Sequence, residues 1–187
     1  MGKKILLLLV ITLMFFSSSL AQGFKAPAEG KAAIYFVRVT NMSFGVIIGY
    51  FQEEKYIGEF KGKGYMRYEC DPGDYLFWGK GESVDYMTVS LKAGGTYVVM
   101  IDIFFGGHIG FHPITDKDAD LFAQAKAMIK GNPPMVTPEK VFAARKEKNE
   151  KLIPEKLKLY NEVYKNDPER HFKHIEADMT ISQDAMK

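Results

Sequence analysis

Apolar and polar residues alternate in short runs between positions 31 and 115, with turn residues between the runs. This pattern predicts β-strands, because successive side chains of a strand point to opposite faces of a sheet. Strands are expected at 33–40, 45–51, 56–60, 65–70, 75–78, 86–91, 96–105 and 108–111. We therefore predict a mainly β protein: an antiparallel β-sandwich of about seven or eight strands, followed by a C-terminal helical tail.

The individual runs indicate where each strand lies in the sheet. Residues 33–40 are β-prone on both faces, which predicts a central strand, and 96–105 is the longest apolar run after the N-terminal one, which predicts a buried strand. Residues 52–55 connect a predicted hairpin, and the sequence Asp-Pro-Gly-Asp at 71–74 is typical of a tight turn. Strict alternation over 65–70 points Cys70 toward the core.

Helix signals begin after the last predicted strand. Thr115 and Asp118 fit a capping box at the start of a helix that runs to about Lys130. Thr137 followed by a proline predicts a second start, and Pro154 is expected to divide that pattern into helices at 138–151 and 154–166. The expected organisation is a signal peptide (1–21), a flexible lead-in (22–30), the β-sandwich (31–115), a helical extension (116–166) and a polar tail (167–187) that frays.

The N-terminus has the three parts of an export signal. Two lysines precede an apolar run at 5–16, and small residues follow, with Ser19 and Ala21 at the third and first positions before Gln22. Cleavage is expected after Ala21, which would leave a periplasmic or extracellular protein. A retained anchor is disfavoured, because the run is about twelve residues and a spanning helix needs roughly 20. Lipid attachment would need a cysteine where Gln22 stands.

Charge and cysteine content narrow the class of protein. Without the two leader lysines the chain has 23 basic and 23 acidic residues, so no electrostatic argument supports nucleic acid as a partner. The single cysteine cannot close an intramolecular disulfide, and the 14 Phe and 10 Tyr residues must supply a stabilising core instead. No stretch after the leader is long and apolar enough to be a transmembrane segment.

Two segments carry a resemblance to a known family. A proline-glycine turn enters an aromatic strand at 72–75, and the pattern L-x-A-G-x-T-Y-x-V follows at 91–99. The segments 33–38 and 55–60 also fit. Residues 31–115 therefore resemble a family of uncharacterised exported bacterial domains, a domain of unknown function related to PEGA-type β-sandwich modules. The resemblance implies a periplasmic or surface-associated sandwich and carries over no catalytic residue.

The candidate site residues are His108, His112 and Asp102. On an extended strand the two histidines would share one face and could hold a metal together with Asp102 or Asp116. A third ligand at a fixed spacing is missing, so strand-end residues at the rim are the favoured interpretation. We assign no catalytic, cofactor-binding or metal-binding residue and expect no cofactor.

Other candidate groups have a simpler explanation. The aspartates at 116, 118 and 120 imitate a calcium loop, but Leu121 and Ala127 replace its glycine and glutamate, which favours a helix start rich in carboxylates. His171 and His174 are expected on a solvated surface. Cys70 would need exposure and a base to act as a nucleophile, and its strand phase points it inward.

Two functional hypotheses remain from the sequence. The first, which we prefer, is a non-enzymatic exported module that binds a protein or another component of the cell envelope. The alternative is an envelope hydrolase or small-ligand-binding protein with a pocket near His108 and His112. The alternative requires those histidines and Asp102 to converge in one pocket.

Overall fold

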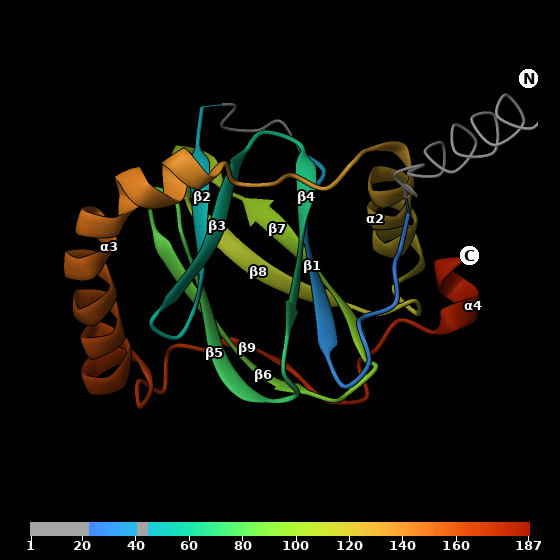
Figure 1. Ribbon diagram of the computed structural model, residues 1–187. Coiled ribbons are helices and arrows are strands. Elements are labelled where there is room, and N and C mark those ends of the chain that lie inside the picture. The colour runs from blue at the N-terminus through green and yellow to red at the C-terminus, as the bar shows by residue number, and fades with distance from the viewer. Residues whose placement is uncertain (1–22, 41–44) are drawn as a thin grey trace, which may run out of the picture.

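The computed structural model describes residues 23–40 and 45–187 and is mainly β (Figure 1). Among these residues, nine strands form two sheets. The strands are β1 (Ala32–Arg38), β2 (Ile47–Gln52), β3 (Lys55–Lys61), β4 (Gly64–Cys70), β5 (Gly73–Lys80), β6 (Val84–Leu91), β7 (Thr96–Ile103), β8 (Ile109–Ile114) and β9 (Lys173–Ile175). Eight of them correspond to the runs that the alternation predicts, and the hairpin closes at Gln52 and Lys55 as expected.

Both sheets are mixed, which corrects the prediction of a purely antiparallel arrangement. The first sheet has the order β4-β1-β7-β8 and the second β3-β2-β5-β6-β9. The pairs β1–β7 and β6–β9 are parallel, and the other pairs are antiparallel. The chain between β1 and β7 passes through five other strands and returns to the end where β1 began, and a connection of that length permits parallel pairing.

One buried cluster contains side chains from both sheets. Phe36 of β1 lies 5.0 Å from Tyr50 of β2 and 5.9 Å from Phe77 of β5, measured between ring centroids. Met87, Val89 and Leu91 all belong to this cluster, as their alternation predicts. Cys70 also faces it and is 8% exposed, which confirms its inward phase.

The first sheet is buried on its other face by helix α2 (Ala119–Gly131). Phe122, Ala125 and Ile129 of α2 join a second cluster with Tyr35 of β1. Residues 23–30, expected to be a flexible lead-in, are fastened to this face: the ring centroids of Phe24 and Tyr35 lie 5.0 Å apart, and the Tyr35 hydroxyl accepts a hydrogen bond from Lys25 N at 2.7 Å.

The second sheet is covered by a long helix, α3 (Glu139–Leu159), which lies on the opposite side of the strands from α2 (Figure 1). A π-helical turn, η2 (Tyr160–Tyr164), continues it. The expected break at Pro154 does not occur. Proline removes one backbone donor, but Ile153 and Leu157 pack against the sheet on either side of it, and Tyr86 of β6 donates a hydrogen bond to Lys156 O at 2.8 Å. Tertiary contacts thus hold the helix through the proline.

The segment after residue 166, expected to fray, is packed against the strands. It supplies β9 and a short helix, α4 (Gln183–Met186). Ile175 and Ile181 are buried, and Ile181 N donates to Thr96 O at 2.8 Å. Apolar residues at single positions in a polar sequence gave no periodic signal, so the pattern did not reveal this order.

The predicted signal peptide, with its cleavage point at Ala21, lies outside the described residues. Within the described part of the chain, no helix has the length and apolar character needed to cross a membrane.

Candidate functional site

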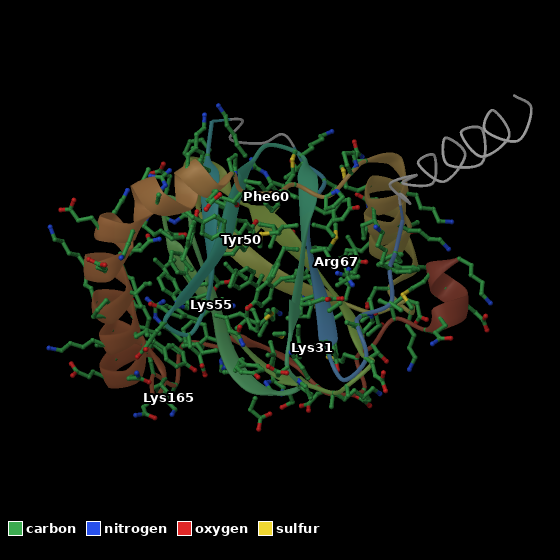
Figure 2. The ribbon with its side chains drawn as sticks, in the orientation of Figure 1. Lys31, Tyr50, Lys55, Phe60, Arg67 and Lys165 are labelled. Atoms are coloured by element: carbon green, nitrogen blue, oxygen red, sulfur yellow. The ribbon has the colours of Figure 1, made fainter. Side chains whose placement is uncertain are left out.

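A groove of about 900 Å³ lies between the second sheet and the end of the covering helix. We call the side lined by residues of β5, β6 and β9 its floor, the side lined by the β2–β3 hairpin a wall, and the side lined by the end of α3 and η2 its roof. Lys55 at the start of β3 and Lys165 just after η2 mark two of its borders (Figure 2). The lining residues are Gln52, Glu53, Glu54, Lys55, Asp74, Tyr75, Leu76, Thr88, Val89, Ser90, Leu157, Tyr160, Asn161, Lys165 and His174. We call this space the polar groove.

Two hydrogen-bonded pairs of polar side chains line the floor of the polar groove. Ser90 donates to the carboxylate of Asp74 at 2.6 Å, and Thr88 Oγ1 lies 2.8 Å from His174 Nδ1 in a hydrogen bond. Strand register creates both pairs, because Asp74 is directly opposite Ser90 and Thr88 directly opposite His174. Alternation turns these residues away from the core, while their neighbours Val89 and Ile175 point into it.

Polar contacts hold the beginning of α3 above the sheet. The guanidinium of Arg145 donates to both carboxylate oxygens of Glu59 on β3, at 2.9 and 3.0 Å, and Tyr56 donates to the same carboxylate at 2.9 Å. Thr137 accepts a hydrogen bond from Glu59 N at 2.7 Å and donates to Glu59 O at 3.0 Å. The threonine that the sequence assigned to a helix cap therefore fastens the helix to β3, and Pro138 is the capping residue.

Aromatic rings support the other end of α3. Phe51 and Trp78 stack with their centroids 3.8 Å apart and their planes inclined by 6°. Tyr86 lies 5.0 Å from Tyr160 of η2, and burial raises the pKa of the Tyr86 hydroxyl well above its ordinary value. Because polar contacts hold one end of α3 and stacked rings the other, the roof of the polar groove has a defined position.

A second, more apolar groove of about 980 Å³ runs along α3. Phe142 lines it and lies 5.1 Å from the ring of Tyr56, in an edge-to-face arrangement. This groove shares Glu54 and Leu157 with the polar groove, so the two spaces adjoin along the helix.

The three candidate residues of the alternative hypothesis do not all converge. His112 on β8 and Asp102 on β7 lie 3.3 Å apart, between Nδ1 and Oδ2, and both are half exposed. His108 precedes β8 instead of sharing a strand face with His112, because the strand begins at Ile109. None of the four cavities characterised in the described chain is lined by these three residues. Within residues 23–40 and 45–187, no three His, Cys, Asp or Glu side chains are grouped to hold a metal ion.

The aspartates and the cysteine that the sequence offered as candidates have structural roles. Hydrogen bonds from Thr115 hold the pKa of Asp118 below its ordinary value, and hydrogen bonds from Ser182 do the same for Asp116. These carboxylates therefore stabilise the start of α2 and its contact with the C-terminal segment. Burial raises the pKa of the Cys70 thiol to about 11, so almost none of it is thiolate at neutral pH.

Sequence analysis missed the floor of the polar groove. Thr88 and His174 are 86 residues apart, and they meet only because β9 pairs with β6. The outward phase of Thr88 and Ser90 was visible in the alternation of 86–91, but β9 has only three residues, too few for a periodic pattern. Comparison of the chain with protein-family models gave no match, and neither did comparison with curated proteins.

Proposed function

We propose that this protein is an exported, non-enzymatic module of β-sandwich type that binds a polar component of the cell envelope in the polar groove. The observation that carries the proposal is the pairing of four polar side chains on the groove floor beneath a helix fixed at both ends. The resemblance to PEGA-type modules and the export signal support the location; the groove supports the binding role.

The chemistry of the polar groove favours a ligand rich in hydroxyl and amide groups. Its walls carry both charge signs, with Glu53 and Glu54 on the hairpin and Lys165 beside the helix end. Hydroxyl and carboxylate groups on the floor retain lone pairs after pairing with each other, and Leu76 and Leu157 supply apolar surface. Saccharides offer these groups together with apolar ring faces, so an amino-sugar oligomer of the envelope is the ligand class that fits.

The same residues are poorly arranged for hydrolysis. In a triad of nucleophile, histidine and carboxylate, the imidazole N–H donates a hydrogen bond to the carboxylate, which orients the ring. His174 Nε2 and Glu176 Oε2 are 3.6 Å apart, which is too long for that bond. Glu176 is also 68% exposed, so water competes for its charge. Binding is therefore the better supported role for the groove.

Titration calorimetry and NMR with an N-acetylglucosamine tetrasaccharide test this function. Binding to the wild type is expected to shift the amide resonances of Asp74, Thr88, Ser90 and His174. Ser90→Ala and Thr88→Val each remove one groove hydroxyl and should weaken binding about fivefold, the effect of one lost hydrogen bond. Absence of binding by the folded wild type would refute the assigned ligand class.

Two matched variants locate the binding site. Asp102→Asn and His112→Gln alter the exposed pair on β7 and β8 and should leave the affinity unchanged if the ligand occupies the polar groove. A loss of affinity in these variants, with none in Ser90→Ala and Thr88→Val, would instead support the alternative pocket near His108 and His112.

A further inference from the structure

One end of the strands gathers exposed apolar side chains. The terminal pairs of four strand ladders lie at this end: Ile47 with Lys61, Arg38 with Gly64, Lys80 with Val84, and Ile103 with Ile109. The turn between β7 and β8 and the segment before α3 reach the same end, since Met135 packs on Gly64 and Val46 packs near Gly107. We call it the apolar end; in Figure 1 it lies at the top, where α3 begins.

Several large apolar side chains at the apolar end are exposed to solvent. Phe105 is 97% exposed, Phe104 54% and Val136 80%, and Met135 is also exposed. Ile47 adds a further exposed apolar side chain at the start of β2. Single exposed apolar residues are common on protein surfaces, but several at one end of a domain mark an interaction surface.

The turn that carries the two phenylalanines has a defined backbone. Phe104 N donates to His108 O at 2.8 Å, and Gly107 N donates to Phe104 O at 3.1 Å. Gly106 and Gly107 have φ values of 79° and 78°, a region that side chains disfavour, and a Cβ on Gly107 would lie 2.7 Å from Cγ of Glu82. The turn backbone is thus well defined, and it carries Phe105 almost fully exposed.

Charge is distributed unequally between the two ends. Residues of the apolar end include Lys61, Lys63, Lys80 and Lys140 with the acidic Glu82, Asp102 and Glu139. The opposite end carries an acidic excess: Glu29, Glu53, Glu54, Asp71, Asp74, Glu176 and Asp178, with Lys31, Lys55, Lys92 and Lys165. A negatively charged surface therefore favours the apolar end over the acidic one.

We infer that the apolar end docks on an anionic lipid membrane, with Phe104 and Phe105 entering the headgroup region and Lys63 near lipid phosphates. Aromatic side chains flanked by lysines are the combination that binds membrane interfaces. A fluid lipid surface accepts two exposed rings without a preformed pocket, whereas a protein partner would need a matching one. This inference is independent of the polar groove and adds a surface on which the domain is held.

Vesicle flotation of the purified protein in its native N-terminal form tests the inference. Vesicles of phosphatidylcholine and phosphatidylglycerol in equal parts should carry the wild type upward, and pure phosphatidylcholine vesicles should carry less. Phe104→Ser with Phe105→Ser should reduce partitioning roughly tenfold or more, since each ring removes a large apolar area from water on insertion. Lys63→Glu should weaken binding to the anionic vesicles, with little effect on the neutral ones.

Val163→Ser is the matched control, because Val163 is 51% exposed on η2, away from the apolar end, and should leave partitioning unchanged. In Phe105→Trp, fluorescence should shift to the blue on vesicle addition, since the native Trp78 is fully buried and should not respond. Equal flotation of the wild type and the double serine variant would overturn the inference. Concentration-dependent dimerisation that those serines abolish, without lipid binding, would also overturn it and assign the tip to a second copy of the chain.

Discussion

The ion pair between Glu59 and Arg145 offers a quantitative test of how α3 is held. Two parallel hydrogen bonds of 2.9 and 3.0 Å join the side chains, whose exposed fractions are 14% and 33%. A hydrogen bond to a charged group contributes about 1.5–3 kcal/mol, and partial exposure reduces this value. A double-mutant cycle with Glu59→Ala and Arg145→Ala is therefore expected to give a coupling free energy of about 1–2 kcal/mol.

Urea unfolding followed by Trp78 fluorescence measures this coupling. Trp78 reports on the helix because it belongs to the cluster that α3 covers. The pair of Glu147 and Lys151 is the matched control: both side chains are more than 80% exposed on the same helix, and their coupling should be at most about 0.5 kcal/mol. If the effects of the Glu59 and Arg145 substitutions on the free energy of unfolding add to within about 0.3 kcal/mol, the ion pair does not hold α3 on the sheet.

Three further predictions concern the core and the C-terminal segment. Phe51→Ala should destabilise the fold by about 3–5 kcal/mol in urea unfolding, because the ring is buried and stacks on Trp78; a cost near that of a surface substitution would contradict the packing. Cys70 should resist a thiol reagent at neutral pH until the protein unfolds, as quenched labelling and mass spectrometry would show, since its pKa is about 11 and it is buried. The start of α4 should be held less firmly in acid: hydrogen bonds from Ser182 lower the pKa of Asp116, so their stabilisation is complete above its ordinary value of 3.8 and is lost as pH falls through the lowered one. Hydrogen exchange of the α4 amides would detect this, and Asp116→Asn should remove the pH dependence.

Strand periodicity gave most of the β architecture correctly. The two buried faces of residues 32–38 were visible in the sequence, because an interior strand covered on both sides needs apolar residues at every position. The hairpin at 52–55 and the inward phase of Cys70 followed from local rules of the same kind. Local alternation predicts which face of a strand is turned toward the core. It does not predict which other strand pairs with that strand.

The pairing of distant strands and the course of α3 could not be predicted for that reason. Parallel pairing of β1 with β7 depends on where a long connection returns, which no local pattern encodes. Pro154 is a helix breaker by its own geometry, and only the contacts of Ile153 and Leu157 with the sheet outweigh it. The floor of the polar groove depends on β9, whose three residues give no periodic signal, so the sequence did not point to His174.

The short strand β9 has a consequence for the order in which the protein can mature. Until residues 173–181 arrive, β6 presents an open row of backbone donors and acceptors, the kind of edge that recruits strands from other molecules. Ile181 must then reach Thr96, and Ala177 must reach the hydroxyl of Tyr97. Because a chain is synthesised from its N-terminus, β6 keeps this open edge until the C-terminal residues have been added.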